Sequence, residues 1–152
     1  MNTAPEFEIE NGVLLKYHGD GGDVVIPDGV TNIGKKAFKG LKTVNSVIIP
    51  DSVTTIEQEA FCACQSLTSI TIPESVRKIS ASVFCDCLNL LSVIISDGTT
   101  HIGINAFCNC YKLTSIVLPN TLTSIGDRAF ENCSNLTSID IPDSVKIGRA
   151  HV

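Results

Sequence analysis

The seven cysteines of this chain are its residues with the greatest potential for chemistry, and three of them recur at a fixed spacing. Cys62, Cys85 and Cys108 each begin a Cys-x-Cys motif, and the motifs follow one another with a 23-residue period. If successive units stack, neighbouring thiols lie about 5 Å apart, because stacked strands are spaced by about 4.8 Å. That distance approaches disulfide reach and also suits soft metals such as zinc or copper. Zinc motifs usually separate cysteines by about two to four residues, so a metal site at these three thiols is kept as an alternative.

The second cysteine of each motif belongs to a different column, three positions after a phenylalanine. Free cysteine is among the most frequently buried residue types and packs as a small hydrophobic side chain. This column is therefore predicted to lie in the core without a chemical role; it comprises Cys64, Cys87, Cys110 and Cys133.

Acidic side chains form a further ladder, one position after each member of a proline column. Calcium needs roughly six to eight oxygens that converge on one point, and a single file of carboxylates spaced by about 5 Å supplies too few. Asp and Asn side chains bond readily to the backbone of their own turn. These residues are therefore interpreted as turn residues: Asp28, Asp51, Glu74, Asp97 and Asp143.

A 23-residue repeat positions these side chains, and several columns share its phase. Phenylalanine recurs at Phe38, Phe61, Phe84, Phe107 and Phe130. Isoleucine recurs at Ile33, Ile56, Ile79, Ile102 and Ile125. Proline recurs at Pro27, Pro50, Pro73, Pro119 and Pro142, with Ser96 in the missing slot. Chance does not produce such columns in phase, so the chain is predicted to be a repeat protein.

Each unit contains the signals of a strand and of a return segment. Ile70 and Ile72 alternate with polar residues, which is strand periodicity. Pro73 ends that strand because it cannot donate to a hydrogen-bond ladder. Residues 83–87 are predicted to form one helical turn. A single unit cannot bury its apolar residues alone, so the units must stack with their strands in parallel and their Phe side chains as an internal spine.

These columns resemble the BspA-like, or Treponema-type, leucine-rich repeat, whose pattern is close to L-x-x-I-x-I-P-x-S-V-x-x-I-G-x-x-A-F-x-x-C. Residues 49–53 and 125–133 match that pattern closely, and the resemblance covers residues 24–145. It implies a right-handed leucine-rich-repeat solenoid with a parallel β-sheet and short helical turns. Ser96 for Pro, Thr99 for Val and Val83 for Ala depart from the pattern, which predicts a local distortion of the third full unit.

The same resemblance implies a non-enzymatic module that binds a protein, or alternatively a glycan, in adhesion or surface recognition. It also implies a location at the cell surface or outside the cell. The N-terminal residues lack the basic start and apolar run of a signal peptide, so the location stays open. Two alternatives are a thiol or metal-binding protein that uses the Cys-x-Cys column, and a passive spacer of a larger protein.

The two ends of the chain lie outside the period. Residues 1–23 are predicted to be a capping β-hairpin and linker, because alternating residues flank the turn signal Asn11-Gly12. Residues 146–152 break the repeat, and Ile-Gly-Arg-Ala-His-Val is what a common sequencing adapter yields when it is translated. The hypothesis is that the natural sequence ends near Val145 because the sequencing read ended there; the alternative is a short natural tail.

The outward positions of the strands form the predicted binding face. An apolar stripe lies within it, and exposed apolar patches often mark partner sites. The alternative is that β-branched residues simply suit strands. Solenoids commonly bind through their extended sheet surface, which favours a binding face made of Ser69, Thr71, Leu91, Ser92, Ile94, Ser115 and Val117.

Composition argues against several other functions. The net charge is −5 and basic side chains are not clustered, which argues against nucleic acid and anionic membrane surfaces as partners. Apolar runs are too short for a membrane span. The three histidines do not pair with a nucleophile, and no phosphate-binding glycine loop is present, so we expect neither an enzyme nor a cofactor.

Overall fold

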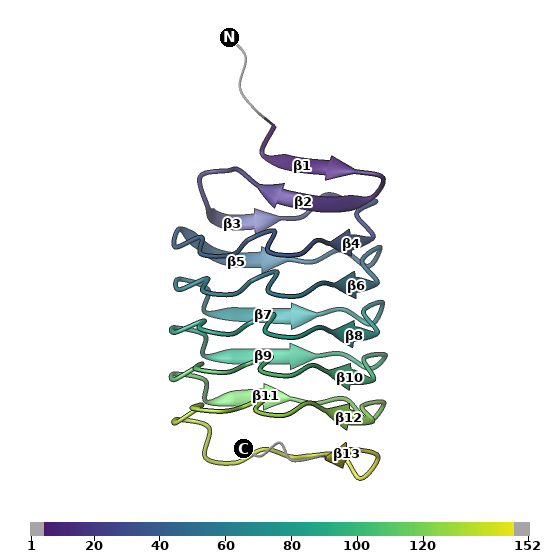
Figure 1. Ribbon diagram of the computed structural model, residues 1–152, viewed down its shortest axis with the longest axis vertical. Helices are drawn as coiled ribbons and strands as arrows, with labels where there is room; N and C mark the ends of the chain where they lie inside the picture. The colour runs from purple at the N-terminus through teal and green to yellow at the C-terminus, as the bar shows by residue number, and fades with distance from the viewer. Residues whose placement is uncertain (1–4, 148–152) are drawn as a thin grey trace.

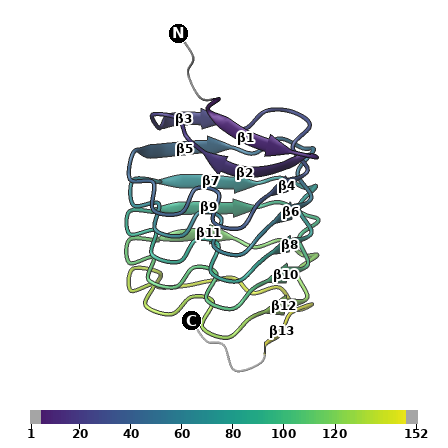
Figure 2. The ribbon, with the colours of Figure 1, turned by 45° about the horizontal axis from the view of Figure 1, so that its top comes forward.

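The computed structural model describes residues 5–147 as a stack of coils that carries two sheets (Figure 1). The long-strand sheet contains, in chain order, β3 (Gly22–Val25), β5 (Val44–Ile48), β7 (Ser69–Ile72), β9 (Ser92–Ile95) and β11 (Ser115–Val117). The short-strand sheet contains β1 (Phe7–Glu10), β2 (Val13–Tyr17), β4 (Asn32–Ile33), β6 (Thr55–Ile56), β8 (Lys78–Ile79), β10 (His101–Ile102), β12 (Ser124–Ile125) and β13 (Lys146–Ile147). The two sheets occupy different sides of the coil (Figure 2).

The 23-residue period sets the register of the strands. In the short-strand sheet each paired isoleucine lies one repeat from the next, in parallel, from Ile33 through Ile56, Ile79 and Ile102 to Ile125. Because equivalent residues of successive repeats stack on one another, each column of the sequence becomes a continuous row along the stack, and the Phe and Ile columns form rows in the core. The predicted β-solenoid with a 23-residue period is therefore confirmed.

The phenylalanine column forms an aromatic spine through the core. Phe61 and Phe84 have ring centroids 5.5 Å apart with an interplanar angle of 3°, and Phe84 and Phe107 are 5.3 Å apart at 10°. Tyr17 of β2 stacks on Phe38 at 5.1 Å, so the hairpin extends the spine. The period did not predict that contact, because Tyr17 is out of phase with the phenylalanine column.

The expected helical turn is replaced by a run of tight turns, and residues 5–147 contain no helix. The amides of Ala60 and Cys62 bond back within the segment, to the carbonyls of Glu57 and Glu59, at 3.2 and 3.1 Å. The amide of Ala63 bonds instead to the carbonyl of Cys85 in the next coil, at 2.8 Å. A helix would use every amide internally, whereas stacked coils need alternate amides for their neighbours. Residues with positive φ interrupt the helical path, among them Lys36, Glu59, Ser82, Asn105 and Arg128.

Ala63 belongs to a second column of residues whose backbone φ is positive, a conformation that alanine rarely adopts. Its φ is 59°, and the equivalent residues are Gly40, Asp86, Asn109 and Asn132. Glycine, asparagine and aspartate tolerate this conformation, whereas alanine is strained there by roughly 1–2 kcal/mol. We expect Ala63→Asn to raise the free energy of unfolding by about 0.5–1 kcal/mol in urea titrations.

Ala60→Asn is the matched control for that substitution, since Ala60 is fully buried and is not among the positive-φ residues. It should destabilise the protein, because the amide would lie in the apolar core. Equal losses of stability in both variants would contradict the conformational explanation.

The predicted distortion of the third full unit is wrong. His101 and Ile102 pair in register with both neighbouring coils. Without a proline ring, the amide of Ser96 donates to the carbonyl of Ile72 at 3.0 Å. Thr99 is buried, and its hydroxyl donates to the carbonyl of Val76 at 2.7 Å. At Ser96 and Thr99, hydrogen bonds to the preceding coil thus replace the apolar contacts of the family's usual Pro and Val, and the stack stays regular.

The first coil is preceded by the predicted hairpin, in which β1 and β2 pair antiparallel and β2 pairs with β4. The boundary proposed after residue 23 falls within β3. At the other end Lys146 and Ile147 pair with Ser124 and Ile125, although this step is one position shorter than the period. Residues 148–152 of the predicted tail lie outside the described residues.

Across residues 5–147, no helix has the length and apolar character that crossing a membrane requires.

Candidate functional site

The exposed face of the long-strand sheet carries a row of side chains that point away from the core. Strand pairing aligns Thr71 with Ile94 and Ile94 with Val117, as the repeat predicts. Ile94 and Val117 are 48% and 53% exposed, although both are large and apolar. Val25 and Ile48 continue the row on β3 and β5 at 60% and 61% exposure. We name this row the apolar stripe: Val25, Ile48, Thr71, Ile94 and Val117.

The other predicted face residues lie at the starts of the strands. Ser69, Ser92 and Ser115 stand in register, and Leu91 is 46% exposed beside β9. The structure thus places six of the seven predicted face residues in register on one sheet, and Leu91 is exposed immediately before β9. The prediction omitted Val25, although it lies two 23-residue steps before Thr71.

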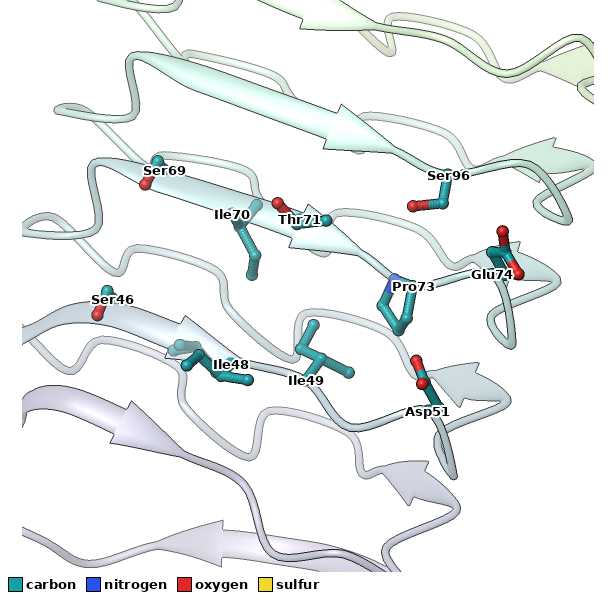
Figure 3. Close-up of a pocket in the computed structure, with 11 residues that line it drawn as sticks. Ser46, Ile48, Ile49, Asp51, Ser69, Ile70, Thr71, Pro73, Glu74 and Ser96 are labelled. Carbon is teal, nitrogen blue, oxygen red and sulfur yellow. The ribbon is translucent and has the colours of Figure 1, made fainter.

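A groove of about 540 Å³ interrupts this face between β5 and β7 (Figure 3). Among the described residues, Ser46 and Ser69 are the one pair that joins these strands, whereas β7 and β9 pair at four positions. Ile48 and Thr71 border the groove from opposite sides. The repeat gave no signal for this opening, because the residues around it fit the same pattern as those of the closed strand pairs.

Two carboxylates lie at the end of the groove where the strands finish. Asp51 follows β5, Glu74 follows β7, and both side chains are exposed. They belong to the acidic ladder, whose members do not form a group of three or more ligands anywhere in residues 5–147. The groove therefore combines walls of mixed apolar and polar side chains with negative charge at one end.

The buried cysteine column is part of the core, as predicted. The thiols of Cys64 and Cys87 donate to the carbonyls of Phe38 and Phe61, at 3.1 and 3.2 Å, and both residues are fully buried. Cys110 and Cys133 repeat the contact one and two coils further on. Burial raises the pKa of Cys64 to about 12, because a thiolate is poorly solvated there. The Cys64 thiol is therefore held protonated at neutral pH.

The Cys-x-Cys column has a different environment. Cys62 is 6% exposed, whereas Cys85 and Cys108 are partly exposed. The thiols of Cys62 and Cys85 and the carboxylate of Asp86 lie within 4.8 Å of one another. The structure does not gather the predicted trio around one point, since Cys108 lies beyond Cys85 in the next coil. Asp86 was not predicted to be part of this cluster, although its position as the middle residue of the Cys85-x-Cys87 motif could have indicated it.

Charged residues occupy the same column at both ends. Lys39 stands one repeat before Cys62, and Glu131 one repeat after Cys108. Lys39 forms an ion pair with Glu59 at 2.5 Å. That hydrogen bond raises the pKa of Lys39 and lowers the pKa of Glu59.

The solved structures that this chain resembles include three leucine-rich-repeat proteins. The T. pallidum leucine-rich-repeat protein matches with 35% identity and a TM-score of 0.82, over 86% of this chain and 63% of that one. A leucine-rich-repeat protein from Eubacterium ventriosum matches with 25% identity and a TM-score of 0.67, over 90% and 44% of the two chains. A leucine rich cell surface protein from Faecalibacterium prausnitzii matches with 25% identity and a TM-score of 0.52, over 82% and 49%. This chain therefore spans less than two thirds of each of these three proteins.

No curated protein matches the sequence. The model of the BspA type leucine rich repeat region matches residues 31–151 with six copies, which is most of the chain. Together with the 23-residue register and the shared fold, this match shows that the chain belongs to the BspA-type leucine-rich-repeat family.

Proposed function

We propose that this protein is a recognition module that binds a partner protein through the exposed face of its long-strand sheet. Proteins of this repeat family serve as protein-binding scaffolds, and the similar solved structures are leucine-rich-repeat proteins. The observation that carries the proposal is the apolar stripe, since Ile48, Ile94 and Val117 each expose about half or more of their surface. Large apolar side chains that a fold leaves in water typically gain binding energy when a partner covers them.

The chemistry of the groove favours a partner that presents basic side chains beside apolar ones. Its walls include Ile48 and Pro73, and its end carries Asp51 and Glu74. The protein's net charge of −5 favours the approach of a basic partner over long range. A segment with an apolar residue next to lysine or arginine would fill the groove and place its cation near the two carboxylates.

We further propose that the partner is recognised at a cell surface, in adhesion or a related contact. The support is the similar Faecalibacterium prausnitzii protein, which is a leucine rich cell surface protein. A protein ligand is preferred to a glycan, because the exposed stripe is apolar and sugar rings need a denser set of polar partners. A passive spacer would have no reason to leave this stripe uncovered.

A selection from a random peptide library displayed on phage tests the proposal while the partner is unidentified. We expect the protein to enrich peptides in which apolar residues neighbour lysine or arginine. The double variant Ile48→Lys, Ile94→Lys should reduce the affinity of synthetic versions of these peptides at least tenfold. It places one charge at the groove and one on the neighbouring strand of the apolar stripe, and both charges would have to be desolvated against the peptide.

The matched control is Thr55→Lys, Ser124→Lys, which adds the same two charges to the short-strand sheet. That column already contains Lys78, so the control should fold and retain binding. A library with no enriched family, or equal binding by the two double variants, would favour the passive spacer instead.

A further inference from the structure

The three cysteines of the Cys-x-Cys column occupy a position at which folding requires no apolar side chain. The end coils place Lys39 and Glu131 there, and both are charged. The buried column is different, because each of its thiols fills the core and donates to a phenylalanine carbonyl. Packing therefore explains the buried column and leaves the Cys-x-Cys column unexplained.

Stacking holds two of these thiols beside a carboxylate. The coils of Cys62 and Cys85 are joined on both sides of the thiols, by Phe61 N to Val83 O at 3.0 Å and by Ala63 N to Cys85 O at 2.8 Å. The two sulfur atoms and a carboxylate oxygen of Asp86 all lie within 4.8 Å of one another. In a tetrahedral zinc site, Zn–S distances of about 2.3 Å place two sulfurs roughly 3.8 Å apart. Small side-chain rotations therefore suffice to bring the three groups around one ion.

The carboxylate is already oriented by a neighbour. Asn109 donates from Nδ2 to one oxygen of Asp86 at 2.7 Å, which leaves the other oxygen available to a ligand. Asn132 in turn donates to the amide oxygen of Asn109 at 2.8 Å. Such outer hydrogen bonds are what fix a carboxylate in a metal site. Asp86 also adopts φ 62°, so its backbone conformation is specified by the turn.

We propose that Cys62, Cys85 and Asp86 bind a thiophilic divalent cation of the zinc class. Two thiolates and one carboxylate suit zinc, cobalt and cadmium, whereas calcium and magnesium prefer oxygen ligands. Cys85 and Asp86 are partly exposed, so solvent supplies the fourth ligand. Cys108 lies outside this ligand set, although its thiol contacts that of Cys85. The site is independent of the proposed binding face.

Cobalt titration of the reduced, metal-free protein under anaerobic conditions tests the site directly. We expect one Co²⁺ to bind per chain, with a sulfur-to-cobalt charge-transfer absorption whose intensity corresponds to two thiolates. Zinc should displace the cobalt and raise the melting temperature. Magnesium should do neither.

Substitutions define the ligand set. Cys62→Ser and Cys85→Ser should each lose most of the charge-transfer band and weaken binding at least tenfold. Asp86→Asn should weaken binding about tenfold while both thiolate bonds remain, and its turn should be preserved because Asn109 and Asn132 adopt the same conformation. Cys108→Ser is the matched control and should retain the band and the affinity.

Circular dichroism and the melting temperature of each metal-free variant establish whether it is folded. We expect all of them to fold, because the end coils accommodate the charged residues Lys39 and Glu131 at the position of the Cys-x-Cys column. The proposal is overturned if the wild-type protein shows no charge-transfer band. It is equally overturned if Cys108→Ser loses the band to the same extent as Cys62→Ser.

Discussion

Phe84→Ala is expected to lower the free energy of unfolding by about 3–5 kcal/mol. Phe84 is fully buried, and its ring stacks on Phe61 at 5.5 Å and on Phe107 at 5.3 Å. Truncation removes the transfer energy of the ring and leaves a cavity between two flat neighbours. The stacked rings cannot close that cavity, because backbone hydrogen bonds fix the spacing of the coils.

The position of a phenylalanine in the spine should determine how much its removal costs. In the described residues Phe130 stacks on one ring, that of Phe107 at 5.4 Å, and therefore makes half the ring contacts of Phe84. Phe130→Ala should cost less than Phe84→Ala in urea titrations followed by circular dichroism. Repeat proteins depend on contacts between nearest neighbours, so equal losses at both positions would contradict a spine stabilised in this way.

The second large effect is expected at alkaline pH and arises from Cys64. Burial raises the pKa of this thiol from an ordinary value of 9.0 to about 12. Below pH 9 the folded and the unfolded chain both hold the proton, so the stabilisation by the neutral buried thiol is complete. Between pH 9 and pH 12 the unfolded chain loses the proton while the folded chain keeps it. The contribution of Cys64 to stability should therefore fall by about 1.4 kcal/mol per pH unit, and by roughly 4 kcal/mol in total.

Comparison with Cys64→Ala isolates this contribution from the titration of lysine, tyrosine and the other thiols. The variant should be less stable than the wild type at pH 8, because it loses buried volume and the bond to the carbonyl of Phe38. The free energy of unfolding of the wild type should fall by roughly 3 kcal/mol relative to that of the variant between pH 8 and pH 11, because the variant has no thiol to titrate at position 64. Ile79→Val, which removes volume without a titrating group, should keep a constant difference. A constant difference for Cys64→Ala would show that the thiol is not held in its neutral form.

The two cysteine columns show how one repeat separates packing from chemistry. Both recur with the 23-residue period and differ by two positions along the chain. Cys64 faces the core and bonds to a carbonyl, whereas Cys85 is partly exposed next to Asp86. Sequence spacing therefore identified the columns, but the direction of each side chain determined which column could bind a ligand.

The sequence by itself determined the fold. Like residues that recur every 23 positions are buried together when the repeats stack as parallel coils. Ile33 pairs with Ile56 and Phe61 stacks on Phe84 because the period brings them into register. The buried cysteines and the outward row of Ile94 and Val117 follow from the same period.

Only the tertiary structure decided the features that depend on short distances across the stack. Alternate amides are needed by neighbouring coils, so residues 83–87 form turns and not a helix. Tyr17 joins the spine although it is out of period, because the hairpin folds over the first coil. The groove between β5 and β7 opens between units that look alike in sequence. Asp86 joins Cys62 and Cys85, and Cys108 is excluded, because ligand atoms must converge within a few ångströms and Cys108 lies two coils away from Cys62.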